Sequence, residues 1–159
     1  MPATPEPAEI DGETERRVAA DLFNLVWRLL DQEERTADDD DAMVHAAHAS
    51  CHHWSRVGTA ENRVRGEWQC SRVYAVLRRP EPALHHAQRC VDLCRGHGIG
   101  DFDLAFAYEA MARAHAVAED YAAAAAWLRQ AEEAAAHVVD AEDREILLSD
   151  IATIPMRPR

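Results

Sequence analysis

Two helices joined by a tight turn are predicted by residues 60–97, AENRVRGEWQCSRVYAVLRRPEPALHHAQRCVDLCRGH. Apolar residues recur at helical spacing over residues 60–77 and again over residues 81–95. Between these segments stands Arg79-Pro80-Glu81-Pro82, and proline fits the first turn of a helix but not its interior. We therefore expect residues 60–97 to form one helical hairpin.

This hairpin has counterparts elsewhere in the chain at an offset of 41 residues. The offset aligns Trp27 with Trp68 in the first helices, and Arg72 with Arg113. In the second helices, the small residues that align are Ala42, Ala83 and Ala124. Small residues let two helices approach closely, so the pattern predicts an internal repeat of three hairpins.

The rest of the chain is predicted to be helical, with short tails. The remaining segments of helical periodicity are 13–34, 42–56, 102–118, 121–137 and 141–152. Residues 1–12 are rich in proline and are predicted to be a disordered tail, and residues 153–159 a short C-terminal tail. Residues 13–152 then form a single domain. The acidic run at residues 36–41 is predicted to be a linker that caps the next helix; the alternative, a calcium loop, would need a glycine and a distal glutamate that the run lacks.

Composition limits the classes of partner. The net charge of −12 argues against nucleic acid and against an anionic membrane surface, because both repel an acidic protein that has no basic cluster. The chain has no apolar run of about 18 residues and no signal peptide, so we expect a cytoplasmic protein. The four cysteines lie within predicted helices, which favours buried free thiols over disulfides.

The aligned residues resemble those of the tetratricopeptide repeat. The first helices carry a small residue, which is Ser71 in one repeat and Ala112 in the next. Tyr74 stands three positions after Ser71. The second helices carry the small pairs Ala83/Cys90 and Ala124/Ala131, and the turn Glu119-Asp120-Tyr121 is also similar. The resemblance covers about residues 14–137. It implies an all-α fold of stacked antiparallel helical hairpins, a tetratricopeptide-like α-solenoid, in which residues 141–152 form a C-terminal capping helix.

The resemblance also implies a concave groove lined by the first helices. The positions that would face this groove are Trp27, Asp31, Trp68, Arg72, Glu109 and Arg113. Tryptophan offers apolar area and arginine binds carboxylates with a planar fork, so the expected partner is a peptide or protein, an acidic one being favoured, or a second copy of the chain. In the alternative interpretation, Glu109 pairs with Arg113 four residues on, and Trp68 packs on Arg72.

A histidine cluster, His45-Ala-Ala-His48-Ala-Ser-Cys-His52-His53, supports a different function. His45, His48 and His52 would lie along one face of a helix, and His48 and His52 have the spacing of two ligands to one metal. Further ligands would have to come from neighbouring helices: Glu67 or His86, with Asp103 and Glu109 as more distant candidates. Ala49 stands where a zinc protease of this motif has glutamate, which excludes that class.

Two functions from different classes follow from these patterns. The first is a scaffold that binds a partner through the groove and needs no cofactor. The second is a small metal-dependent enzyme or metal-binding protein that uses the histidines and Glu67 to hold one divalent transition metal, such as iron, manganese or zinc. The remaining alternatives for the histidines are a structural role or a response to pH near neutrality.

Overall fold

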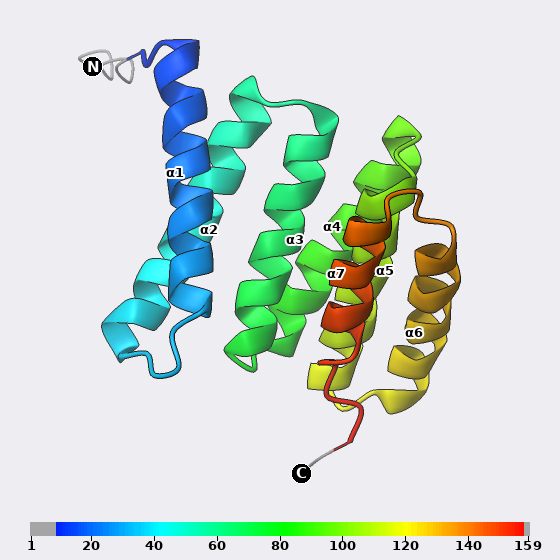
Figure 1. Cartoon of the computed structure of the whole chain (residues 1–159). Helices are drawn as coiled ribbons and strands as arrows, with labels where there is room; N and C mark the ends of the chain where they lie inside the picture. The colour runs from blue at the N-terminus through cyan, green and yellow to red at the C-terminus, as the bar shows by residue number, and fades with distance from the viewer. Residues whose placement is uncertain (1–8, 158–159) are drawn as a thin grey trace, which may run out of the picture.

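The protein is described by a computed structural model that covers residues 9–157. Within that range it consists of helices joined by short loops and contains no strand. The helices are α1 (Gly12–Leu30), α2 (Ala37–Val57), α3 (Ala60–Val76), α4 (Pro80–His97), α5 (Asp101–Val117), α6 (Tyr121–Ala136) and α7 (Ala141–Ile151). In Figure 1, α1 and α2 lie at one end of the molecule and α6 at the other. The predicted all-α fold class is confirmed.

Helices that follow one another along the chain pack against each other. The closest neighbours are α1 with α2, α3 with α4, and α5 with α6. Helix α3 also contacts α1, α2 and α5, and α7 contacts α5 and α6. This order of neighbours is compatible with a helical repeat fold.

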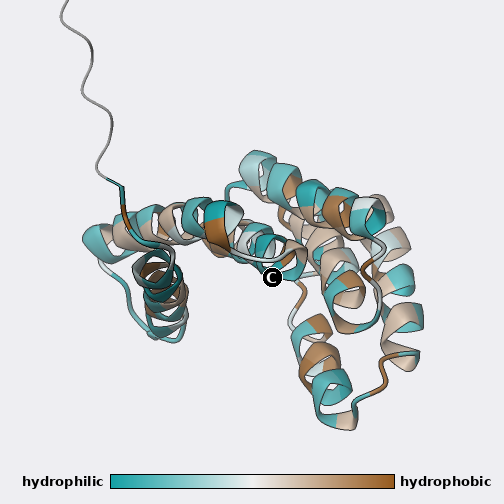
Figure 2. Cartoon of the chain, turned by 90° about the horizontal axis from the view of Figure 1, so that it is seen from above, coloured by the Kyte–Doolittle hydropathy of each residue, from teal (hydrophilic) through white to brown (hydrophobic). Residues whose placement is uncertain are grey.

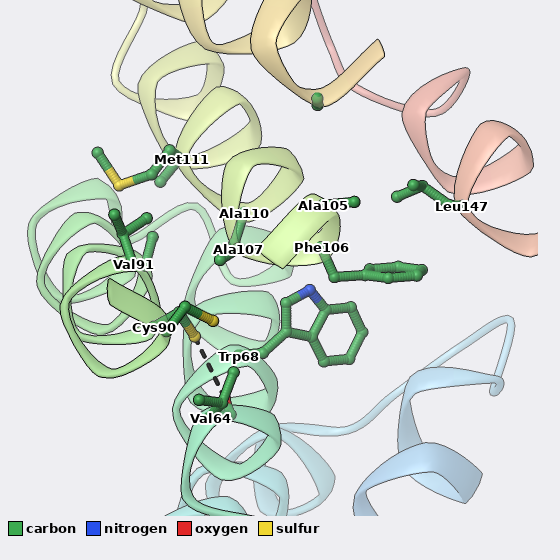
Figure 3. Close-up of a cluster of buried hydrophobic side chains, with 14 of the residues drawn as sticks. Val64, Trp68, Cys90, Val91, Ala105, Phe106, Ala107, Ala110, Met111 and Leu147 are labelled. Atoms are coloured by element: carbon green, nitrogen blue, oxygen red, sulfur yellow. Dashed lines mark hydrogen bonds between the residues drawn. The ribbon is translucent and has the colours of Figure 1, made fainter. Parts of the chain in front are cut away.

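Small residues bring α3 and α4 together, as their alignment predicts. Ala83, Ala87 and Cys90 of α4 have no exposed surface. The Ser71 hydroxyl of α3 donates a hydrogen bond of 2.9 Å to the carbonyl of Ala83. The Cys90 thiol lies 3.3 Å from the carbonyl oxygen of Val64, the contact drawn as a dashed line in Figure 3. Such contacts need the two backbones to be close, which larger side chains would prevent.

The largest hydrophobic core is formed by buried residues of α3, α4, α5, α6 and α7. Figure 3 shows side chains of this core from α3, α4, α5 and α7, including Trp68, Val91, Phe106 and Leu147. Seen from above in Figure 2, the helices carry both hydrophobic and hydrophilic residues. Over residues 9–157, no helix combines the length and the apolar composition needed to cross a membrane.

The junction between α1 and α2 differs from the prediction. Helix α1 ends at Leu30 rather than at residue 34, and α2 begins at Ala37 rather than at residue 42. Thr36 is the N-cap: its hydroxyl accepts a hydrogen bond from the Asp39 amide (3.1 Å), and the Asp39 carboxylate accepts one from the Thr36 amide (2.9 Å). This reciprocal capping box starts the helix early. The acidic run therefore forms the first turn of α2, where the positive end of the helix dipole stabilises its carboxylates.

The structure describes part of each predicted tail, residues 9–12 and residues 153–157. Residues 1–8 of the predicted N-terminal tail lie outside them, while Asp11 caps α1 by accepting a hydrogen bond of 2.9 Å from the Thr14 amide. In the predicted C-terminal tail, Ile154 is buried against a small cluster on α5 and α6.

Candidate functional site

The residues predicted to line a groove come from α1, α3 and α5, and five of the six lie in one connected region. The rings of Trp27 and Trp68 are 5.6 Å apart between centroids. The Trp68 indole nitrogen donates a hydrogen bond of 3.3 Å to Glu109. Asp31 is the exception, since it caps the end of α1 and is exposed.

Glu109 is the centre of a buried charged network. Its side chain has no exposed surface, and besides Trp68 it accepts hydrogen bonds from Arg113 Nε (2.7 Å) and Arg72 Nη2 (3.4 Å). The Arg72 guanidinium also lies over the Trp68 ring, 5.0 Å from its centroid. Burial lowers the pKa of the Arg113 guanidinium, and the Glu109 carboxylate opposes this effect. The pairings of the alternative interpretation, Glu109 with Arg113 and Trp68 with Arg72, are therefore present.

Helix α7 engages both arginines of this network. Asp150 Oδ2 lies 3.0 Å from Arg72 Nη2. Arg113 Nη2 donates hydrogen bonds to the Asp150 carbonyl (2.9 Å) and to the Thr153 hydroxyl (2.8 Å). The two guanidinium groups that were expected to bind a partner's carboxylate are thus paired within the chain.

The part of this region that stays open is an aromatic pocket of about 170 Å³ between α1, α3, α5 and α7. Its lining residues are Phe23, Trp27, Val64, Arg65, Trp68, Phe102, Asp103, Phe106, Ile146 and Asp150. The rings are in contact with one another: Trp68 meets Phe106 edge to face at 5.6 Å, and Phe102 lies 4.6 Å from Phe106. Figure 3 shows Trp68 and Phe106 side by side at this place.

The rim of the aromatic pocket carries charge. Arg65 forms a two-pronged ion pair with Asp103, with distances of 2.9 and 3.1 Å. The hydrogen bond with Asp103 raises the pKa of the Arg65 guanidinium, and the charges of Asp103, Glu61 and Asp143 add to this effect against the opposing effect of burial. Three carboxylates therefore act on this one arginine at the edge of the pocket.

Several pocket residues were not predicted from the sequence. Phe23 stands four residues before Trp27, and Phe106 three residues before Glu109. A spacing of three or four residues places Phe23 on the helix face of Trp27, and Phe106 on that of Glu109. This spacing is the sequence signal that identifies both phenylalanines. Ile146 and Asp150 belong to a helix whose position the repeat pattern does not specify.

A second site brings together side chains of α2, α3 and α4. His48, Cys70 and His86 each direct a potential ligand atom to a place where these atoms all lie within 4.8 Å of one another. We call these three residues the histidine–cysteine cluster. Gly66 contributes to it because α2 passes close by: a Cβ at this position would lie 3.3 Å from Cys51 Cα.

Polar residues orient both histidines of the cluster. His86 Nδ1 lies 2.6 Å from Glu67 Oε2, and His48 Nε2 lies 2.8 Å from the Tyr74 hydroxyl. The Tyr74 ring stacks on His86, with 5.8 Å between centroids and 7° between planes. Burial opposes ionisation of the Glu67 carboxyl, but the hydrogen bond and charge of His86 leave its pKa below the ordinary value.

The ionisation of the cluster depends on its surroundings. Partial burial lowers the pKa of His48, and the nearby His86 lowers it further. The neighbouring Cys51 thiol, together with burial, raises the pKa of Cys70, which has no exposed surface. In the absence of a bound cation, the site therefore favours a neutral imidazole on His48 and a neutral thiol on Cys70.

The structure separates the predicted metal ligands into two groups. His48 and His86 belong to the cluster, with Glu67 bonded to His86, whereas His45 and His52 are exposed and outside it. His53 instead contacts the buried carboxylate of Glu15 at 3.0 Å. The sequence predicts Cys70 to be a buried core thiol and so does not identify it as a ligand, although it lies three residues after Glu67 on the same helix.

Comparison of the chain with protein-family models, with curated proteins and with solved structures finds no match. What the aromatic pocket and the histidine–cysteine cluster can bind is therefore inferred from their own residues and geometry.

Proposed function

We propose that this protein is a tetratricopeptide-like stack of helical hairpins, with α7 packed against α5 and α6, that binds a peptide segment of a partner protein. The aromatic pocket is the binding site, and it takes one large apolar side chain of the peptide. The observation that carries the proposal is the open pocket of about 170 Å³ walled by five aromatic rings.

The size and the chemistry of the aromatic pocket support one apolar anchor. An apolar cavity of about 150 Å³ is large enough to hold benzene, so a pocket of about 170 Å³ accommodates a phenylalanine or leucine side chain. Aromatic walls favour such a guest through contact area and edge-to-face ring packing. Concave, mostly apolar sites with a few polar groups at the edge are the common form of binding pocket.

Charge favours a partner with basic residues beside the anchor. Asp103 and Asp150 at the pocket are paired with Arg65 and Arg72, and the further carboxylates of Glu61 and Asp143 near Arg65 leave an excess of negative charge on this side. The net charge of −12 extends this preference over longer distances. The expectation of an acidic partner depended on Arg72 and Arg113, and both are engaged by α7 and Glu109. We therefore propose an apolar anchor flanked by lysine or arginine.

The test is selection from a random peptide library displayed on phage, followed by affinity measurement on the enriched peptides. Ile146 lines the pocket and is 49 % exposed, whereas Leu148 is 47 % exposed on the same helix and does not line it. Ile146→Asp should weaken the enriched peptides at least about tenfold because it places a charge in an apolar site. Leu148→Asp is the matched control and should leave the affinity unchanged.

Three outcomes would overturn the proposal. The library could yield no enriched sequence, the enriched peptides could lack an apolar anchor, or they could bind the Ile146→Asp variant as tightly as the unmodified protein. A fourth would replace it: sedimentation could show a dimer that Ile146→Asp dissociates, and the pocket would then belong to an interface between two copies of the chain.

A further inference from the structure

We propose that the histidine–cysteine cluster is a binding site for a single zinc ion, with Glu67 orienting one of the ligands. The inference is independent of the aromatic pocket, which lies among α1, α3, α5 and α7. It also changes the ligand set expected from the sequence: His48 and His86 stay, Cys70 enters, Glu67 becomes a supporting residue, and His45 and His52 are left out.

The types of ligand favour zinc over a hard cation. Two imidazole nitrogens and one thiolate suit zinc and its transition-metal neighbours, whereas magnesium and calcium need sets of oxygen ligands. Ligand atoms held at about 2.0–2.3 Å from one tetrahedral zinc are about 3.5 Å apart. The three atoms here lie within 4.8 Å of one another, and a turn of the exposed His48 ring, which exchanges its hydrogen bond with Tyr74 for the metal, closes the remaining distance.

Glu67 gives the cluster the supporting contact that metal-bound histidines have in other proteins. A histidine that binds a metal through one ring nitrogen donates the N–H of the other to a carboxylate or carbonyl, which fixes its tautomer. His86 Nδ1 lies 2.6 Å from Glu67 Oε2, so the nitrogen left to bind the metal is Nε2. A purely structural Glu67–His86 pair would not require a thiol and a second imidazole beside it.

Charge and proton balance fit a doubly charged cation. Binding breaks the Cys70 S–H bond, forms a zinc–sulfur bond and releases one proton to solvent. The charge of zinc is then matched by the Cys70 thiolate and the Glu67 carboxylate, and both histidines bind as neutral imidazoles. These three protein ligands leave one position of a tetrahedral zinc for water on the side of the exposed His48.

The experiment uses the full chain without a histidine tag, freed of metal with a chelator and titrated with zinc against a competing chromophoric chelator. Cobalt(II) replaces zinc in a parallel titration, because a thiolate ligand gives a charge-transfer absorption in the near ultraviolet. The unmodified protein should bind one equivalent of either metal, and the cobalt form should show the thiolate band. Circular dichroism checks that each variant remains helical.

The variants separate this ligand set from all others in the chain. Cys70→Ala should abolish the thiolate band, His48→Ala and His86→Ala should each weaken zinc binding by more than about tenfold, and Glu67→Gln by about 10- to 100-fold. His48 is exposed, so its variant tests the site without disturbing the core. The matched controls are His85→Ala, next to His86 in the chain, and Cys94→Ala, a buried thiol outside the cluster; both should bind as the unmodified protein does.

The proposal is overturned if the unmodified protein binds less than one equivalent, or if helical Cys70→Ala and His48→Ala variants keep the full affinity. It is also overturned if His45→Ala and His52→Ala remove the metal while Cys70→Ala retains it, since that result would assign the site to the exposed face of α2.

Discussion

Asp150 of α7 and Arg72 of α3 form an ion pair, with 3.0 Å between Oδ2 and Nη2, although 78 residues separate them in the chain. Arg72 also contacts Glu109 of α5, so one guanidinium connects three helices. Through this pair the last helix closes one side of the aromatic pocket and neutralises an arginine that the repeat pattern assigns to a partner.

Removal of the Asp150 carboxylate should loosen α7. The Arg72 side chain is only 13 % exposed and would lose a charged hydrogen-bond partner. We expect Asp150→Ala to lower the free energy of unfolding by about 1–3 kcal/mol in urea denaturation. Glu145→Ala, an exposed residue of the same helix, is the control and should change it by less than about 0.5 kcal/mol. Equal effects of the two variants would show that the ion pair does not hold α7.

The buried carboxylate of Glu109 should be essential to stability. Glu109→Gln keeps the size of the side chain but leaves Arg113 and Arg72 without their shared counter-charge in a buried place. Breaking a buried ion pair on one side costs about 3–5 kcal/mol, and we expect a loss of that size in urea denaturation. The exposed Glu133→Gln serves as control. A loss below about 1 kcal/mol would indicate that water reaches the network.

Part of the acid sensitivity of the fold should come from Glu15. Its buried carboxylate contacts His53 (3.0 Å) and Arg56 (2.7 Å). The hydrogen bond from His53, and then Arg56, lower the pKa of this carboxyl below the ordinary value of 4.5, against the opposing effect of burial. Because this pKa is lower in the folded state, the stability from Glu15 is present above about pH 4.5 and is lost as the pH falls through the folded-state pKa.

The measurement for Glu15 is the free energy of unfolding against pH. Glu15→Gln should flatten the acid side of that curve, while Glu13→Gln, an exposed change on the same helix, should leave its slope as it was. If the two curves have the same slope below pH 4.5, the interaction of Glu15 with His53 and Arg56 does not contribute to acid unfolding.

Helical periodicity and proline placement predict where most of the helices lie, because helix formation depends largely on residues close together in the chain. They locate the start of α2 poorly, since Thr36 and Asp39 cap each other and extend the helix into an acidic run that was expected to be a linker. The site residues are harder still. His45, His48 and His52 share a helix face by spacing, but only His48 meets side chains of α3 and α4. Likewise, no local pattern shows that Asp150 reaches Arg72.

Gly66 should be needed for the close approach of α2 and α3, and a comparison with Gly96 isolates this role. A methyl group at position 66 would lie 3.2 Å from Cys51 Sγ and 3.3 Å from Cys51 Cα, so α2 has to give way there by a few tenths of an ångström. A methyl group on Gly96 of α4 meets nothing within 4 Å. Gly96→Ala should therefore stabilise the protein by about 0.5–1 kcal/mol through helix propensity.

Gly66→Ala gains the same helix propensity but overpacks the interface, which costs about 1–3 kcal/mol, so urea denaturation should show a net loss or no gain. The shift of α2 would also carry His48 away from Cys70 and His86, and zinc affinity should fall while the Gly96→Ala variant keeps it. If both alanines stabilise the protein equally, α2 and α3 can accommodate a methyl group at Gly66. The placement of His48 would then depend on its hydrogen bond with Tyr74 rather than on the close packing of the two helices.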